Sequence, residues 1–160
     1  GGLIPFYNLL GLHYTDARTG ASRANVATGA IKKSQSLDVI FSQQLVAKYG
    51  EENVHWQSPY NKKGKTLHRS DFKVYTSPTR FFFVDLFFPQ DMWSLQGCVS
   101  IKVKKLSKIE IEANAPVYFI SCNEENISPY LIERYIEARK NPMPKNITLM
   151  HISDARIKLL

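Results

Sequence analysis

The chain has 160 residues, of which 44% are hydrophobic and 22% are charged, as expected for one globular domain with a single core. No apolar stretch approaches the roughly 20 residues of a membrane-spanning helix, and the first residues lack a secretory signal pattern. Lysines and arginines number 21 against 14 aspartates and glutamates, a net charge of +7 that favours a polyanionic partner, although the same charge also serves solubility.

The first part of the chain is basic and irregular. Residues 14–36 are rich in glycine, alanine, serine and threonine and contain a single acid, Asp16. Two interpretations stay open: a basic strap that lies against nucleic acid, or an arm that is disordered until a partner binds. We assign residues 1–35 to a basic N-terminal segment and residues 36–160 to one domain. The basic residues of the segment are Arg18, Arg23, Lys32 and Lys33.

The remaining chain predicts one helix, then several antiparallel strands, then a strand–helix–strand unit. Ser36 is a candidate N-cap and Gly50 a candidate C-cap for a helix with apolar residues at helical spacing. Ser128-Pro129 predicts the start of a second helix. The predicted strands cover residues 54–57, 67–75, 80–88, 98–105, 117–122 and 147–152. This order predicts one α/β domain with a central mixed sheet flanked by helices.

The two cysteines, Cys98 and Cys122, both fall in predicted strands. Two are too few for a disulfide framework or a zinc cluster. We therefore expect free thiols and an intracellular, cytoplasmic protein that does not contact a membrane.

Asp85 is the only charged residue inside the aromatic run of residues 81–88. A strand that is apolar on both faces belongs in the middle of a sheet, where an ionised carboxylate is costly unless something compensates it. A buried lysine or arginine would compensate it in a purely structural role. A divalent cation would compensate it in a functional one.

Asp71 precedes Asp85 at a spacing that suits a shared site. If residues 67–75 and 80–88 form a hairpin that turns at residues 77–79, the two aspartates lie near its open end. Two carboxylates on neighbouring strands can hold Mg²⁺ or Mn²⁺. The alternative for Asp71 is an exposed carboxylate at a strand edge.

Lys102 belongs to the predicted strand of residues 98–105, together with Lys104 on the same polar face. A hairpin through residues 89–97 would place Lys102 roughly opposite residues 83–85. A lysine there can orient an attacking water and offset charge in a phosphoryl transition state. The alternative is a solvated polar face, and we interpret Lys104 in that way, as a contact for nucleic acid.

The motifs Ser70-Asp71-Phe72 and Asp85-Leu86-Phe87 resemble those of the PD-(D/E)XK, or restriction-endonuclease-like, nuclease superfamily. The resemblance spans residues 36–122 and implies that fold, with a metal held by Asp71 and Asp85. Phe87 stands where the family has its lysine, so the resemblance implies either an inactive site or a lysine from elsewhere. Lys102 is the natural supplier.

An acid early in the preceding helix, Asp38, is similar to the arrangement in TnsA-type transposon endonucleases. The resemblance therefore adds Asp38 as a candidate catalytic residue. Two alternatives stay open. Asp38 could complement the helix dipole from the first turn, or Glu51 or Glu52 could be the helix acid.

These observations predict a Mg²⁺-dependent (or Mn²⁺-dependent) endonuclease, a hydrolase acting on double-stranded DNA, with specificity supplied by loops, a homo-oligomer or a partner subunit. One alternative is a catalytically inactive nucleic-acid-binding module on the same fold, and another is a protein-assembly domain. The residues expected to contact phosphates are Arg18, Arg23, Lys32, Lys33, Lys62, Lys63, Lys65 and Lys104.

Overall fold

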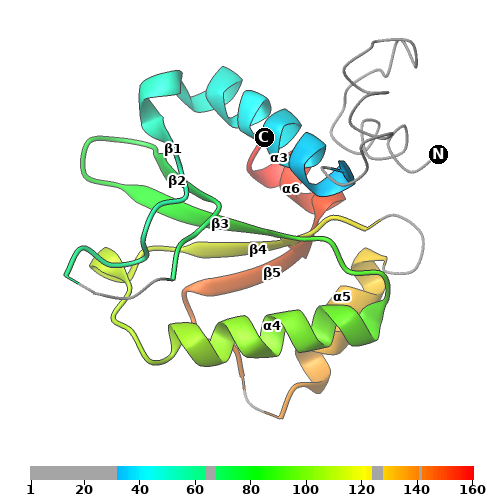
Figure 1. The fold of residues 1–160 in the computed structure, drawn as a ribbon. Coiled ribbons are helices and arrows are strands. Elements are labelled where there is room, and N and C mark those ends of the chain that lie inside the picture. The colour runs from blue at the N-terminus through cyan, green and yellow to red at the C-terminus, as the bar shows by residue number, and fades with distance from the viewer. Residues whose placement is uncertain (1–31, 64–67, 124–127, 141) are drawn as a thin grey trace, which may run out of the picture.

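The computed structural model describes residues 32–63, 68–123, 128–140 and 142–160 (Figure 1). They form one α/β domain around a mixed five-stranded sheet of order β1-β2-β3-β4-β5, as the sequence predicted. β1, β2 and β3 pair antiparallel, whereas β3, β4 and β5 pair parallel. The strands are β1 (Val54–Trp56), β2 (Phe72–Tyr75), β3 (Phe81–Phe87), β4 (Val117–Ser121) and β5 (Ile147–His151).

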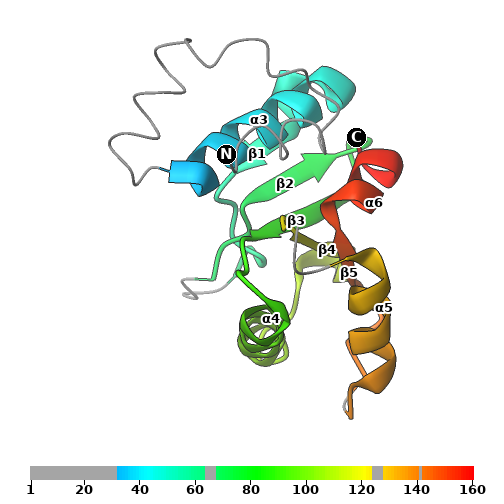
Figure 2. The same ribbon diagram turned by 90° about the vertical axis from the view of Figure 1, so that its right-hand side faces the viewer.

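Helices cover both faces of the sheet (Figures 1 and 2). α3 (Lys32–Tyr49) and α6 (Ile152–Lys158) pack on one face, and α4 (Met92–Leu106) and α5 (Pro129–Ala138) pack on the other. Alternate residues of β3 supply the two cores: Phe82 and Val84 face α3, and Phe83 faces α4. This arrangement explains the apolar character of β3 on both sides.

The sequence predicted some helix ends correctly and one wrongly. α3 begins at Lys32, so Ser36 lies inside the helix and its prediction as N-cap is wrong. Gly50 follows the last residue of α3 with φ +96°, as the C-cap prediction requires. Ser128 caps α5, because its side chain accepts a hydrogen bond from the N–H of Leu131, and Pro129 is the first helical residue.

The strand predicted over residues 98–105 is wrong, because these residues belong to α4. Asp91 caps this helix by accepting a hydrogen bond from the N–H of Ser94. Leu95, Val99 and Leu106 are buried at helical spacing, whereas Ile101, which the strand prediction placed beside Val99, is 59% exposed. A helix is also what the topology needs, since two parallel strands such as β3 and β4 require a crossover connection.

Parallel pairing brings several strand ends to one edge of the sheet. β3, β4 and β5 all end there, and the antiparallel β2 begins there. Such an edge is the usual place for a functional site in an α/β sheet. Asp71 lies at this edge, just before β2, and Asp85 lies near the end of β3. Over the part of the chain that the structure describes, no helix is long and apolar enough to cross a membrane.

Candidate functional site

Asp71 and Asp85 are direct neighbours across the β2–β3 hairpin, as predicted. The last paired residues at this end are Phe72 and Val84, and the two aspartates come next on each side. The N–H of Asp71 donates a hydrogen bond to Asp85 Oδ1 (3.2 Å), and the N–H of Leu86 donates to Asp71 Oδ2 (2.7 Å). Each carboxylate therefore binds the opposite strand's backbone, which fixes both side chains.

Lys102 reaches this pair from α4 and not from a strand. Its Nζ lies 3.6 Å from Asp85 Oδ1 and donates to the backbone oxygen of Arg69 (3.4 Å). The same ammonium lies 5.4 Å from the ring centre of Tyr60, which is fully buried. The expected proximity of Lys102 to Asp85 is therefore present, although the secondary structure that was expected to create it is not.

Asp38 approaches from the opposite face of the sheet, on α3. Because α3 begins at Lys32, Asp38 lies beyond the first turn, and its interpretation as a first-turn residue facing the helix dipole is wrong. Its Oδ1 is buried and makes no hydrogen bond with any described residue. Burial, and then the negative charge of Asp71, raise the pKa of Asp38 to about 7. Glu51 and Glu52, the competing acids, lie in the exposed short helix η1 (Glu51–Asn53) that follows α3.

Burial dominates the electrostatics of the two central aspartates. Asp85 is 4% exposed, and desolvation raises its pKa to about 6 against the opposing effects of Lys102 and of the Asp71 N–H. Burial also raises the pKa of Asp71, while the Leu86 N–H and the charge of Lys102 act to lower it. Asp38, Asp71 and Asp85 are therefore three neighbouring carboxyl groups with raised pKa values, and one lysine supplies compensating charge.

A divalent cation fits this donor set in part. No three side chains of the described histidines, cysteines, aspartates and glutamates converge closely enough to hold a metal. However, Mg²⁺ keeps several waters and is commonly held by one or two carboxylates together with substrate phosphate. Asp85 Oδ2 and Asp38 Oδ1 are both buried, and neither has a hydrogen-bond partner among the described residues. Both oxygens are thus available to a cation or to water bound to it.

Two further residues border the acids. Phe87, two residues after Asp85, packs its ring against Phe119 with 5.1 Å between centres, so an aromatic contact and not a charged group occupies this position. Cys122 follows β4 and is buried. Burial, and then the charges of Asp38 and Asp71, raise the pKa of its thiol. This proximity was not predicted, because the sequence places Cys122 only in a strand and no spacing along the chain connects it with Asp38 or Asp71. Neither Cys98 nor Cys122 forms a disulfide.

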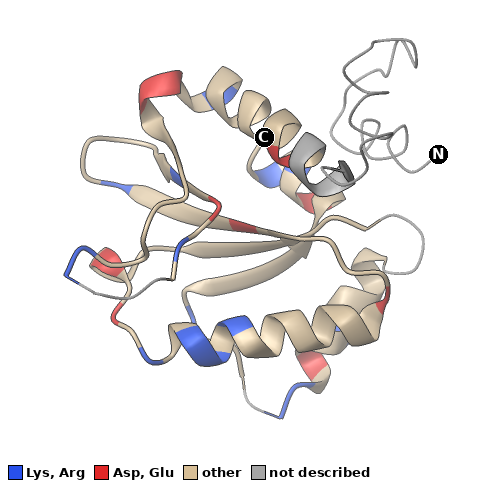
Figure 3. Ribbon diagram, in the orientation of Figure 1, with Lys and Arg blue, Asp and Glu red and all other residues tan. Residues whose placement is uncertain are grey.

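Only some of the residues predicted to contact phosphates lie in the part of the chain that the structure describes. Lys62, Lys63 and Lys104 are exposed, and Lys62 Nζ pairs with Glu112 Oε1 at 3.1 Å. Basic residues gather on the loop after β1 and on the C-terminal half of α4, on the same side of the molecule (Figure 3). Arg18, Arg23 and Lys65 lie outside the described residues, as do the side chains of Lys32 and Lys33.

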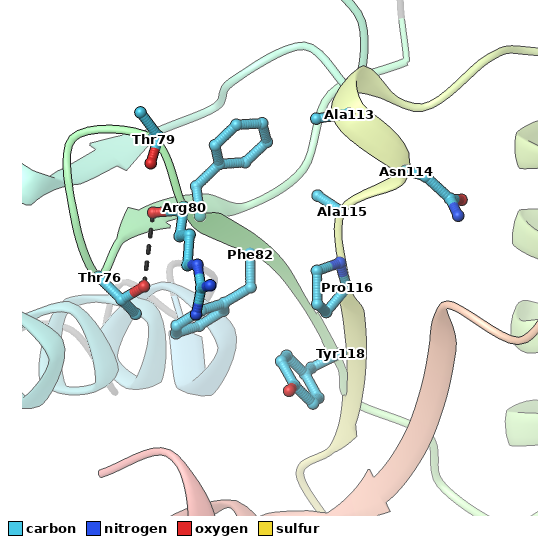
Figure 4. Close-up of a pocket in the computed structure, with 10 residues that line it drawn as sticks. Thr76, Thr79, Arg80, Phe82, Ala113, Asn114, Ala115, Pro116 and Tyr118 are labelled. Atoms are coloured by element: carbon cyan, nitrogen blue, oxygen red, sulfur yellow. Dashed lines mark hydrogen bonds between the residues drawn. The ribbon is translucent and has the colours of Figure 1, made fainter.

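Two hollows on the described part of the surface lie away from the acids. One, of about 300 Å³, is lined by residues including Thr76, Arg80, Asn114 and Tyr118 at the opposite edge of the sheet (Figure 4). Another, of about 510 Å³, lies between the end of α4 and the start of β5. Neither contains Asp38, Asp71, Asp85 or Lys102. The candidate site is defined by its cluster of charged side chains and not by either of these two hollows.

Comparisons with protein-family models, with curated proteins and with solved structures found no match to this chain. The function must be inferred from the site itself.

Replacing Asp38 with asparagine is expected to raise the free energy of unfolding at pH 8 by about 1 kcal/mol, an amount reduced for partial exposure. The folded pKa of about 7 exceeds the ordinary value of 3.8, so the contribution of this group is full below pH 3.8 and is lost as the pH rises through 7. Urea unfolding at pH 5 and pH 8 measures the difference. Glu133→Gln, an exposed change on α5, is the control. Equal pH dependence in wild type and Asp38→Asn would contradict the prediction.

Proposed function

We propose that this protein is a Mg²⁺-dependent (or Mn²⁺-dependent) endonuclease that hydrolyses phosphodiester bonds in DNA. The observation that carries the proposal is the joining of Asp71 and Asp85 by reciprocal hydrogen bonds, with Lys102 Nζ 3.6 Å from Asp85. Asp38 adds a third acid, close enough for its pKa to respond to the charge of Asp71. Clustered acids with raised pKa values and one adjacent lysine favour chemistry on a polyanion over a structural role.

Each of these residues has a role in the proposal. Asp71 and Asp85 would hold the cation, which polarises the phosphate and lowers the pKa of a bound water. Lys102 would hold the attacking water or offset negative charge on the phosphate, since its ammonium is fixed by Asp85 and by the Arg69 carbonyl. Asp38 would orient water on the α3 side of Asp71.

The basic surface supplies the means of holding DNA in this proposal. Lys62, Lys63 and Lys104 would bind phosphates and so position the backbone without reading its sequence. The basic residues of the segment 1–35 would add phosphate contacts, and a second copy or a partner subunit would add specificity. The free thiols Cys98 and Cys122 support an intracellular setting.

Cleavage of supercoiled plasmid tests the proposal. We expect nicking by wild type in Mg²⁺ or Mn²⁺, none in EDTA, and a loss of at least about 100-fold in Asp71→Ala. Glu133→Ala, a matched change of an exposed acid on α5, should cleave like wild type. Equal nicking by wild type and Asp71→Ala would show that the activity does not come from this site, and the proposal would be wrong.

A specific observation favours one second candidate, a nucleic-acid-binding module without activity. Phe87 occupies the position of the family's lysine and packs against Phe119. This candidate predicts DNA binding that weakens with salt and no cleavage in any metal. Absent or salt-insensitive binding would instead favour a protein-assembly domain.

A further inference from the structure

Trp56, the last residue of β1, leaves 46% of its surface exposed at the edge of the sheet where the acids lie. It pairs in register with Phe72, the residue that follows Asp71. The Trp56 and Phe72 rings are 4.8 Å apart at 65°, and Phe72 is fully buried. The indole is thus held against a fixed core residue while nearly half of Trp56 meets water.

The residue after Trp56 ties this strand end to the candidate site. Gln57 has φ +51°, a left-handed conformation that is uncommon outside glycine and that clusters at functional sites. Its N–H donates to the Asp71 carbonyl (2.9 Å), and its own carbonyl accepts from Arg69 Nη1 (3.0 Å). The backbone carbonyl of Arg69 in turn accepts from Lys102 Nζ (3.4 Å). A continuous set of hydrogen bonds therefore links the end of β1 to both Asp71 and Lys102.

We propose that Trp56 is a stacking platform for an unpaired nucleobase next to the phosphate that the acids receive. An aromatic face stacks with any exposed base, whereas bases inside a duplex have their faces covered by neighbouring bases. The substrate class is then nucleic acid with a single-stranded element, such as a flap, a frayed end or a single strand. This inference rests on the proposed nuclease function and narrows its substrate.

The position of Trp56 favours a nucleobase over other apolar partners. Two cationic side chains bind the backbone that adjoins it: Arg69 Nη1 donates to the carbonyl of Gln57, the next residue, and Lys102 Nζ donates to the carbonyl of Arg69. A base brings a flat apolar face and a phosphate together, which matches a half-exposed indole at the same strand ends as the acids and Lys102. Trp93 is more exposed, at 83%, but it lies in the first turn of α4 and no hydrogen bond ties it to the acids among the described residues.

Intrinsic fluorescence provides the test, because the chain contains two tryptophans. Trp93→Phe leaves Trp56 as the reporter, and Trp56→Phe leaves Trp93. We expect a single-stranded oligonucleotide in EDTA to quench the emission of Trp93→Phe and to leave that of Trp56→Phe unchanged. Trp56→Ala should weaken single-strand binding by about tenfold and duplex binding by less than about twofold, while Trp93→Ala changes neither.

The outcomes separate this inference from the nuclease proposal. Absent quenching in Trp93→Phe, or equal weakening of single-strand and duplex binding in Trp56→Ala, would overturn the platform even if metal-dependent cleavage were found. Quenching confined to Trp93→Phe would support the platform even if no metal gave cleavage, in which case the nuclease proposal alone would fail. The Trp93→Phe variant keeps Trp56, so its fluorescence still tests the proposal if Trp56→Ala does not fold.

Discussion

Lys102→Met is expected to lower the rate of metal-dependent DNA cleavage by about 10²–10³-fold, in addition to the stability lost when buried Asp85 loses its ion-pair partner. The Lys102 ammonium lies 3.6 Å from Asp85 Oδ1, where it would meet a phosphate or its attacking water. Methionine keeps an unbranched apolar side chain, one atom shorter than that of lysine, and removes the charge and its hydrogen-bond donors. Single-turnover cleavage of a labelled oligonucleotide measures the effect on the chemical step.

Lys104→Met is the matched control, because Lys104 lies two residues away on α4 and is exposed. Both variants lose one positive charge, so both should weaken DNA binding in EDTA to a similar, small extent and reduce its salt dependence equally. Only Lys102→Met should lose the chemical step. A cleavage rate in Lys102→Met that equals that of Lys104→Met would remove Lys102 from the reaction and leave it as a compensating charge for Asp85.

The sequence predicted the hairpin better than the helix that follows it. β2 and β3 are short aromatic and β-branched strands joined by a turn with proline, and these local signals place Asp71 opposite Asp85 without further information. In α4 the signals conflict. Val99, Ile101 and Val103 alternate like a strand, but Leu95, Val99 and Leu106 are the residues that the core buries. Tertiary packing selected the helical spacing over the alternation on which the strand prediction rested.

Only the part of the candidate site that lies on two neighbouring strands could be predicted from the sequence. Asp71 and Asp85 follow from the hairpin, whereas Asp38 and Cys122 come near them because α3 and the end of β4 meet at the same edge. No spacing along the chain encodes that meeting. The same holds for Trp56, whose link to Asp71 and Lys102 depends on the backbone of Gln57 and the side chain of Arg69.

Asp85→Asn is expected to abolish cleavage, by at least about 10³-fold, and at the same time to stabilise the metal-free protein at pH 8. Asparagine keeps an oxygen that can accept the Asp71 N–H but removes the charge that burial makes costly. The rise in pKa from 3.8 to about 6 corresponds to about 3 kcal/mol as an upper limit. The uncompensated charge of Lys102 in the variant offsets part of this, so we expect a gain of about 1–2 kcal/mol.

The direction of the pH dependence follows from proton uptake. Between pH 4 and pH 6 the folded protein holds a proton on Asp85 that the unfolded chain has released, so the stability of the wild type falls as the pH rises through this range. Asp85→Asn should lack this part of the slope. Urea unfolding in EDTA from pH 4 to pH 8 measures it, with Glu133→Gln as the control for an exposed acid.

Adding Mg²⁺ or Mn²⁺ at pH 8 distinguishes a metal site from a buried ion pair. A cation that binds only the folded wild type raises its melting temperature in a concentration-dependent manner, because binding is linked to folding. Asp85→Asn should show little or no such rise, although it begins from a higher melting temperature. If the variant were less stable than wild type in EDTA at pH 8, and both responded equally to the metal, Asp85 would serve as the structural partner of Lys102. A more stable Asp85→Asn variant would therefore support a functional role for Asp85. If the protein kept this acid only for stability, replacing it would lower the free energy of unfolding and not raise it.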